Sequence, residues 1–359
     1  MSKKEISFNV LHICDYAALY RGNFIDSLES IEKYHENVKN YYLFPARTGN
    51  TAAKEWIDAM NENGPVAYIQ KGNILKRAVQ LSKIIKKHKI NRVVRHFYDF
   101  KIDIALKFLF GGKRVVRFFH GGCPHESNAV KRMIKRFIWK NNKMVGVSDA
   151  ITGEIRREFP DYESFSIVNA IHFDRLDKTD DFTKPEGISL LMMGWDYKRK
   201  GVDLAIKAAD NLRGKYDLIL LLVGGKNEDR IRELTREILG HDADWVRFLP
   251  ATNNIGTYFN AADIFLSPSR QEAFGYANVE AAYCKDSIVL SRVDGQGELQ
   301  IEGAYWIKRD DVDDFTEKLE KAIVELNDPE KLAQKEKVKE QVKKIYSLEE
   351  WTNKLVALF

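Results

Sequence analysis

Short runs of β-branched and aromatic residues alternate with longer helical patterns along this chain of 359 residues. In the front half the strand candidates are Ile6–Ile13, Tyr41–Phe44, Val66–Ile69, Arg92–Phe97, Arg114–Phe119, Met144–Val147 and Ser166–Val168. Helical patterns between them cover Asn23–Lys33, Ala52–Asn61, Leu75–Lys87, Ile102–Phe110, Val130–Lys140 and Ala150–Glu158. Nearly all-apolar strands joined by helices imply parallel sheets covered on both faces. The alternation therefore predicts an α/β fold.

The alternation restarts after the polar stretch Asp174–Gly187 (DRLDKTDDFTKPEG), which we interpret as a linker. The second set of strand candidates is Ser189–Met193, Asp217–Val223, Val246–Leu249, Asp263–Ser267, Ile288–Leu290 and Tyr305–Ile307. Its helices are Val202–Leu212, Asp229–Leu239, Ile255–Asn260, Ala277–Cys284 and Val312–Glu325, and two more follow in Pro329–Phe359, broken near Tyr346–Ser347.

Two units of this kind predict two domains, since the chain is longer than one hydrophobic core usually organises. We expect Rossmann-like domains at residues 1–172 and 173–346, with the C-terminal helix 347–359 completing the first. Their parallel sheets would face each other across a cleft. Ligands of such sheets collect at the carboxyl ends of the strands.

Several classes of protein fit the sequence poorly. No segment approaches the roughly 20 uninterrupted apolar residues of a membrane helix, and the start MSKKEISFNV has no apolar signal-peptide core. The three cysteines (Cys14, Cys123 and Cys284) lie far apart and form no CxxC pair, so we expect reduced thiols and no structural zinc. These features predict a cytoplasmic protein.

The net charge of +5 conceals two halves of opposite sign. Residues 1–172 carry 29 Lys and Arg against 17 Asp and Glu, whereas the remainder carries 28 against 35. Two basic stretches, Lys76–Arg92 and Lys131–Lys143, have helical patterns with apolar residues between the bases. One interpretation is a pair of surface helices whose apolar faces pack on the core; the other is a face that rests on anionic lipid headgroups. Nucleic acid is a poorer partner, because no recognition motif accompanies the charge.

The most informative segment is Leu266–Lys285, LSPSRQEAFGYANVEAAYCK. An apolar strand leads through a turn that holds Glu272 into a helix that begins near Gly275. The backbone N–H groups around Phe274, Gly275 and Tyr276 therefore lie at a helix N-terminus, which binds anions. Glu280 follows roughly 7.5 Å further along the helix axis, about the distance from a diphosphate to the ribose hydroxyls of the same nucleotide.

This E-A-F-G-Y-A-N-V-E segment resembles the E-x7-E motif of family 4 retaining glycosyltransferases (glycosyl transferases group 1), which have the GT-B fold. The resemblance implies that Glu272 faces the donor sugar hydroxyls and that Glu280 binds the ribose. It also implies that the N–H groups of Phe274, Gly275 and Tyr276 hold sugar and phosphate.

A second segment, Leu190–Ala209 (LLMMGWDYKRKGVDLAIKAA), agrees with the first. A strand ends at Gly194 and a short basic turn precedes the next helix, so Arg199 and Lys200 can counter the charge of a leaving diphosphate. The turn resembles that of the lipopolysaccharide core α-glucosyltransferases, G-x-D-F/Y-x-R-K-G-x-D. Trp195 stands where a commoner family pattern has arginine, and Lys198 is a competitor for the same role.

Four further positions match the family more loosely. Gly22 resembles a glycine loop that faces the donor diphosphate or the acceptor. His120 matches a histidine near the scissile bond, although a histidine after an apolar strand is, taken alone, more often structural. Asn169 resembles a hinge residue, and Glu298 falls where the family has G-G-x-P-E.

The resemblance implies a retaining, hexosyltransferase-type glycosyltransferase. It would move a sugar from a nucleoside diphosphate sugar to a glycan or lipid-linked acceptor, in bacterial cell-surface polysaccharide or glycolipid synthesis, on the inner face of the membrane. We expect no cofactor and no metal. The one D-x-D sequence, at Asp242 and Asp244, precedes its strand instead of ending it. The alternatives are a non-catalytic partner subunit that binds nucleotide sugar or glycan, and a sugar phosphorylase; an NAD-dependent oxidoreductase lacks its GxGxxG.

Overall fold

The computed structural model describes residues 7–16, 21–46, 54–63, 65–70, 72–97, 100–194, 196–224, 228–284 and 287–359. Its contacts divide the chain into two compact units. Unit 1 comprises Met1–Ala170 and Leu348–Phe359, and unit 2 comprises Ile171–Ser347. Within the described ranges, every helix is too short or too polar to cross a bilayer.

Unit 1 is built on a seven-stranded sheet in the order β3-β2-β1-β4-β5-β6-β7, in which every pair is parallel. The strands are β1 (Phe8–Cys14), β2 (Val38–Pro45), β3 (Val66–Ile69), β4 (Arg92–His96), β5 (Val115–Phe119), β6 (Lys143–Gly146) and β7 (Ser164–Ser166). Chain order reverses beside β1, which has β2 on one side and β4 on the other. This reversal is the topological switch point of the sheet.

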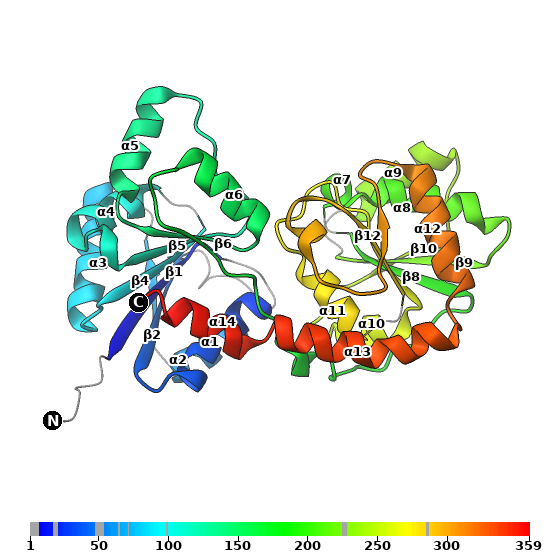
Figure 1. Ribbon diagram of the computed structural model, residues 1–359, viewed down its shortest axis with the longest axis horizontal. Coiled ribbons are helices and arrows are strands. Elements are labelled where there is room, and N and C mark those ends of the chain that lie inside the picture. The colour runs from blue at the N-terminus through cyan, green and yellow to red at the C-terminus, as the bar shows by residue number, and fades with distance from the viewer. Residues whose placement is uncertain are drawn as a thin grey trace. The chain divides into compact units, whose positions relative to one another are not determined.

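Helices cover both faces of this sheet, with α3 and α4 on one face and α1 and α14 on the other (Figure 1). The helices of unit 1 are α1 (Asn23–Tyr34), α2 (Lys54–Asn63), α3 (Ile74–Lys87), α4 (Phe100–Leu109), α5 (Ala129–Trp139), α6 (Asp149–Glu158) and α14 (Leu348–Val356). The last of them arrives from the far end of the chain. Trp351 on α14 packs against Phe118, and the final Phe359 packs against Phe8.

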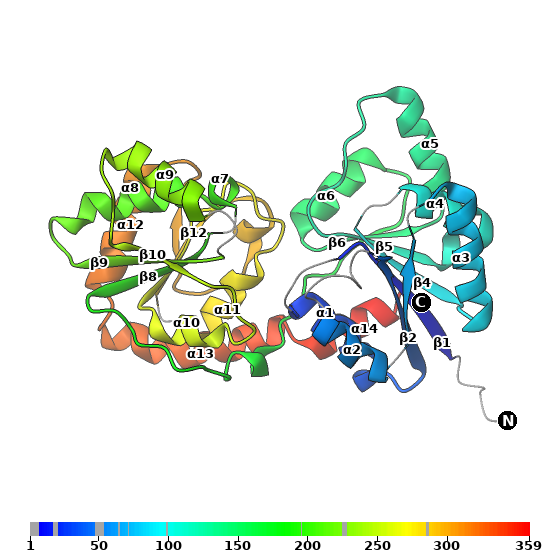
Figure 2. The same ribbon diagram turned by 180° about the vertical axis from the view of Figure 1, so that it is seen from behind.

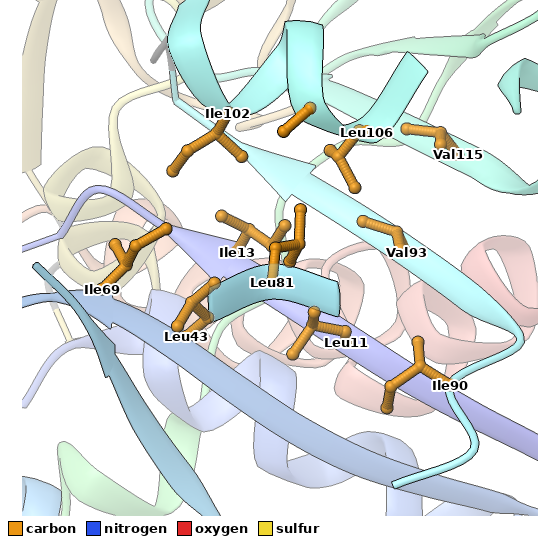
Figure 3. Close-up of a cluster of buried hydrophobic side chains, with 11 residues drawn as sticks. Leu11, Ile13, Leu43, Ile69, Leu81, Ile90, Val93, Ile102, Leu106 and Val115 are labelled. Carbon is orange, nitrogen blue, oxygen red and sulfur yellow. The ribbon is translucent and has the colours of Figure 1, made fainter. Parts of the chain in front are cut away.

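One hydrophobic core of unit 1 lies between β1, β4 and the helices α3 and α4 (Figure 3). Leu11 and Ile13 of β1 meet Leu81 of α3 and Leu106 of α4, and all four are at most 3% exposed. Successive residues of a strand point to opposite faces, so Leu11 and Ile13 share one face and leave His12 on the other.

A buried ion cluster fastens α4 and α5 to this sheet. The Asp103 carboxylate accepts hydrogen bonds from Arg95 of β4 (3.0 Å), from Arg117 of β5 (2.9 Å) and from the Trp139 indole (3.1 Å). Burial by itself raises the pKa of Asp103, but the two guanidinium groups hold it below its ordinary value. The carboxylate therefore stays charged, as a buried group with three donors can.

Unit 2 has a six-stranded parallel sheet in the order β10-β9-β8-β11-β12-β13. Its strands are β8 (Ile188–Met193), β9 (Leu218–Val223), β10 (Val246–Leu249), β11 (Ile264–Ser267), β12 (Ser287–Ser291) and β13 (Tyr305–Ile307). Its helices are α7 (Tyr197–Lys200), α8 (Val202–Arg213), α9 (Glu228–Leu239), α10 (Gly256–Ala261), α11 (Tyr276–Cys284), α12 (Val312–Val324) and α13 (Pro329–Ile345). Figure 2 shows α8, α9 and α12 on one face, and α10, α11 and α13 on the other.

The prediction of an α/β fold with two parallel sheets is confirmed. The sequence did not indicate α7, a single helical turn where only a basic turn was expected. The expected linker also packs more closely than a free tether would. Asp180 N donates to Thr257 Oγ1 at 2.8 Å, and the Phe182 ring packs on Tyr258 at 5.3 Å, so the linker is part of unit 2.

Candidate active site

The switch point of unit 2 lies between β8 and β11, where strand order reverses. Two loops leave the carboxyl ends of these neighbouring strands, one running from Gly194 to Gly201 and the other from Pro268 to Gly275. Ligands of doubly wound sheets bind at such a reversal. These two loops lie in the two segments from which the sequence predicted a donor site.

Capping residues shape the first loop. Gly194 is buried. Its N–H donates to Val223 O at 2.9 Å and so continues the pairing of β8 with β9. Asp196 caps α7 by accepting from Arg199 N at 3.2 Å, and its carboxylate also accepts from the Arg199 side chain at 3.0 Å. The short helix ends at Gly201, whose φ of +72° favours glycine.

The two loops are held together at close range. A Cβ on Gly201 would lie 2.1 Å from Pro268 O, so only glycine permits this approach. Arg270 links the loops further, because its backbone N donates to Arg199 O (2.7 Å) and its side chain donates to Lys198 O (2.7 Å). The same guanidinium holds both carboxylate oxygens of Asp203 at 2.7–2.8 Å.

Three predicted site residues meet at this junction. Lys200 Nζ lies 2.5 Å from Glu272 Oε2, and Arg199 Nη1 lies 3.5 Å from the same oxygen. Lys200 and Glu272 are only 12% and 13% exposed, whereas the neighbouring Lys198 is exposed. The two cations thus converge on one oxygen of Glu272.

Gly275 joins Glu272 to the start of α11. Its φ of +87° is unfavourable for other residues, and a Cβ there would lie 2.2 Å from Asn278 Nδ2 and 3.1 Å from Glu272 Cγ. Phe274 is buried, and its ring packs at 5.3 Å on Tyr276, the first residue of the helix. A small cavity lined by Lys200, Ala277 and Asn278 brings the lysine to the first turn of α11, where backbone N–H groups and the helix dipole favour an anion.

The side-chain amide of Gln296 supports this second loop. Gln296 is fully buried, and its Nε2 donates to Ser267 O (3.0 Å) and Ser291 O (2.7 Å). Its Oε1 accepts from Asn278 Nδ2 at 2.8 Å, and its backbone N donates to Glu272 O at 3.2 Å. One residue therefore connects β11, β12, the Glu272 backbone and the first turn of α11.

Glu280 lies on α11, as predicted, and is 6% exposed. Its Oε1 lies 3.7 Å from Arg175 Nη1, in the short 3-10 helix Phe173–Arg175 at the start of the linker. A buried carboxylate beside a guanidinium is a strong hydrogen-bond acceptor.

The remaining two predicted site residues belong to unit 1. Gly22 caps the N-terminus of α1, where its carbonyl accepts from Ile25 N at 3.0 Å. His120 directly follows β5, and its Nε2 lies 3.1 Å from His96 Nδ1. Burial lowers the pKa of His120 to about 4, so its imidazole is neutral at pH 7.

The weaker candidates fall outside these groups. Asn169 is buried in the irregular segment before unit 2, and Glu298 is exposed at the end of a 3-10 helix. Asp242 pairs with Arg236 at 2.6 Å in an exposed turn before β10. Trp195 lies outside the described residues. In the part of the chain that the structure describes, no three His, Cys, Asp or Glu side chains cluster as metal ligands do.

The sequence did not indicate the supporting residues Arg270 and Gln296. Arg270 lies within the segment Leu266–Lys285, but only its hydrogen bonds to Arg199 O and Lys198 O show that it joins the two loops. Gln296 stands between Gly295 and Gly297. A glutamine between two glycines gives no sequence signal of complete burial.

Comparisons with known proteins agree with the geometry. Residues 175–341 match the family model "Glycosyl transferases group 1". One component of the human phosphatidylinositol N-acetylglucosaminyltransferase is 33% identical over 165 residues, which are 45% of this chain and 33% of that protein. The lipopolysaccharide glucosyltransferase WaaG of Escherichia coli is 38% identical over 93 residues, 26% of this chain and 25% of WaaG. The matched segments thus span a third or less of these relatives' own lengths.

Solved structures resemble the chain over nearly its whole length. A glycosyltransferase from Rickettsia africae has a TM-score of 0.79 at 17% identity and covers 98% of this chain and 97% of its own. Anabaena Alr3699/HepE, solved with UDP and glucose, has a TM-score of 0.76 at 14% identity and covers 98% of both chains. Likeness at such low identity shows the fold, which is GT-B. Residues 175–341 therefore form a glycosyl transferases group 1 domain, and the fold of the chain is GT-B.

Proposed function

We propose that the protein is a retaining glycosyltransferase of the hexosyltransferase type that uses a nucleoside diphosphate sugar as donor. The observation that carries this proposal is the meeting of Arg199, Lys200 and Glu272 beside the glycine-started helix α11. Cations and helix N–H groups suit a diphosphate, and an oriented carboxylate suits sugar hydroxyls. The relatives that transfer sugars support the same activity.

Each part of the donor has a partner in this proposal. The N–H groups at Gly275 and Tyr276 and the side chains of Arg199 and Lys200 bind the diphosphate. Glu272 accepts hydrogen bonds from donor sugar hydroxyls, and Glu280 accepts them from the ribose. Arg199 and Lys200 are both engaged with Glu272. Lysine has three N–H donors, so it can bind phosphate without releasing the glutamate.

The anomeric configuration is retained because the acceptor attacks the donor sugar from the face of the leaving group. As the glycosidic bond loosens, Arg199 and Lys200 stabilise the negative charge that grows on the leaving diphosphate. The acceptor hydroxyl then attacks from the side of the departing phosphate, whose oxygen takes its proton. This route needs no second carboxylate of the glycosidase kind.

We propose that transfer needs no divalent metal, because two fixed cations already converge where the diphosphate would bind. Dialysis against EDTA should leave turnover unchanged. Loss of turnover that magnesium restores would contradict this part of the proposal and leave the donor site untouched.

The acceptor is proposed to be a lipid-linked or anionic glycan at a membrane surface, and α5 supports this. Val130, Met133, Ile134 and Phe137 follow helical spacing on one face and are 42–65% exposed. Of the apolar side chains of this helix, only Ile138 and Trp139 are buried against the core. Lys131 flanks the exposed face, and Phe108 of the neighbouring α4 is 74% exposed. An outward apolar face with flanking bases binds anionic lipid surfaces.

The experiment that tests the function is a donor screen followed by one substitution. UDP-, GDP- and ADP-sugars would be incubated with the protein and lipid extract, and transfer products with the donor's anomeric configuration are expected. Glu272→Ala should abolish transfer. Full turnover by that variant would favour a non-catalytic role for the motif, and release of free sugar 1-phosphate in the presence of phosphate would favour the phosphorylase alternative.

A further inference from the structure

A row of four polar side chains runs across the sheet of unit 1. Asn40 lies on β2, His12 on β1, His96 on β4 and His120 directly after β5, and these strands are neighbours in that order. Asn40 Oδ1 lies 3.1 Å from His12 Nε2, His12 Nδ1 lies 3.4 Å from His96 Nε2, and His96 Nδ1 lies 3.1 Å from His120 Nε2. We call these four residues the histidine row.

Aromatic rings enclose the row. Asn40, His12 and His96 are fully buried. The ring of Phe24 on α1 lies at 78° to the His96 ring with centroids 5.0 Å apart, and the Phe97 ring stacks on His120 at 4.7 Å. The backbone of Phe97 has a φ of +61°, which is rare for an aromatic residue and marks strain held by its surroundings.

The amide of Asn40 sets the direction of the hydrogen bonds. Its Nδ2 donates to Leu28 O at 3.0 Å, so the oxygen faces His12 and can only accept. His12 Nε2 must therefore carry a proton. A neutral imidazole has one donor and one acceptor, so His12 Nδ1 accepts from His96 Nε2. By the same step His96 Nδ1 accepts from His120 Nε2.

The surroundings keep the three imidazoles neutral. Burial lowers the pKa of His12 to about 4, and burial with the neighbouring His120, His12 and Arg95 lowers the pKa of His96 further. Among the described groups, no carboxylate counters this effect on either ring. An imidazolium inside the row would be a buried charge without a counter-ion.

We propose that Asn40, His12 and His96 are positioning residues that fix His120 as its Nε2–H tautomer, so that His120 Nδ1 offers a lone pair to a substrate hydroxyl group. Nδ1 has no hydrogen-bond partner among the described residues, and His120 is only half-buried. A lone pair accepts from a sugar hydroxyl and repels a phosphate oxygen. This inference rests on the proposed function for the identity of the substrate.

The tautomer can be measured without any substrate. Protein labelled with ¹⁵N-histidine, studied by long-range ¹H–¹⁵N NMR at pH 7, should show His120 with a protonated Nε2 and an unprotonated Nδ1. A His120 spectrum of the opposite tautomer, or of imidazolium, would overturn the proposal.

Two substitutions test whether the row sets this state. His96→Phe keeps a ring but removes the acceptor, and Asn40→Leu keeps the side-chain shape but removes the oxygen at the far end. Both should turn His120 into a mixture of tautomers. His125→Gln is the matched control, since His125 is an exposed histidine of unit 1 that pairs with Glu158 outside the row. An unchanged His120 spectrum in both row variants would also overturn the proposal.

Folding and function are read separately. Circular dichroism and binding of nucleoside diphosphate, which unit 2 provides in our proposal, report whether each variant folds. Asn40→Leu and His96→Phe should lower kcat/KM about tenfold, the size of one lost hydrogen bond, while diphosphate affinity is unchanged. A protein that binds no nucleoside diphosphate would refute the proposed function and leave the NMR result standing.

Discussion

The two units share one order of six parallel strands, to which unit 1 adds β7, but they carry different chemistry where strand order reverses. Beside β8 and β11, unit 2 places the cations Arg199 and Lys200 around Glu272. Beside β1 and β4, unit 1 places the neutral rings of His12 and His96 among phenylalanines. Yet the front half of the chain, 1–172, carries the excess of positive charge.

This difference shows that the net charge of a domain does not locate its binding chemistry. Many bases of unit 1 lie on the surface helices α3 and α5, and Arg95 lies in a buried ion cluster. The acidic half concentrates two cations at one point. A diphosphate needs charge at close range, whereas an uncharged hydroxyl needs an oriented acceptor. Substitutions in the two units can overturn this contrast.

Among the residues proposed to bind the diphosphate, the largest expected effect comes from Lys200→Met, which keeps the side-chain length and removes the charge beside Glu272. We expect kcat to fall by about 10²–10³-fold, as for removal of one donor to a developing anion. Lys198→Met is the matched control, because Lys198 is an exposed lysine of the same helical turn. If steady-state kinetics show the same loss of kcat in both variants, then only the total positive charge near α7 matters, and the position of Lys200 does not.

Gly275→Ala should have the next largest effect. The added Cβ would lie 2.2 Å from Asn278 Nδ2 in a backbone conformation that disfavours alanine. We expect about a 100-fold loss in kcat/KM with a smaller loss in melting temperature. Gly214→Ala is the control, since a Cβ there meets nothing within 4 Å and φ is −65°. Wild-type activity of Gly275→Ala would contradict the predicted role of this turn.

Glu272→Gln separates binding from transfer. The substitution removes the carboxylate that engages Lys200 and Arg199. Nucleoside diphosphate should therefore bind about tenfold more tightly, while sugar transfer is lost. Weaker diphosphate binding by calorimetry would show that the glutamate organises the cations and does not compete for them.

The smallest effect is expected at the surface of unit 1. Phe137→Glu on α5 replaces a 56% exposed apolar side chain and should reduce sedimentation with anionic vesicles several-fold. Transfer to a soluble acceptor should not change. Equal binding of the wild-type protein to neutral and anionic vesicles would contradict the membrane proposal itself.

Much of the fold was predictable because its signals are local. The apolar runs of β8 and β9 and the helix after Gly275 follow directly from hydrophobic pattern and turn chemistry. The loops that bear Arg199 and Glu272 were predictable for the same reason, since each follows a strand that the sequence marks.

Contacts between side chains far apart in the sequence were not predictable. Arg270 joins Asp203 across 67 positions, and His12 meets His96 across 84. Pairings at such separations depend on strand order, which a single sequence does not specify. The burial of the apolar residues of α5 was left open, because helical periodicity reports that an apolar face exists and does not report what covers it.

The central claim is that unit 2 binds a diphosphate through Arg199, Lys200 and the start of α11. Isothermal titration calorimetry with UDP, GDP and ADP, each compared with its own nucleoside, tests this claim most directly. We predict that one diphosphate binds in the presence of EDTA, that its nucleoside binds at least tenfold more weakly, and that the double variant Arg199→Ala, Lys200→Met removes this difference. Equal affinity of the wild-type protein for diphosphate and nucleoside, or unchanged diphosphate binding by the double variant, would contradict the account.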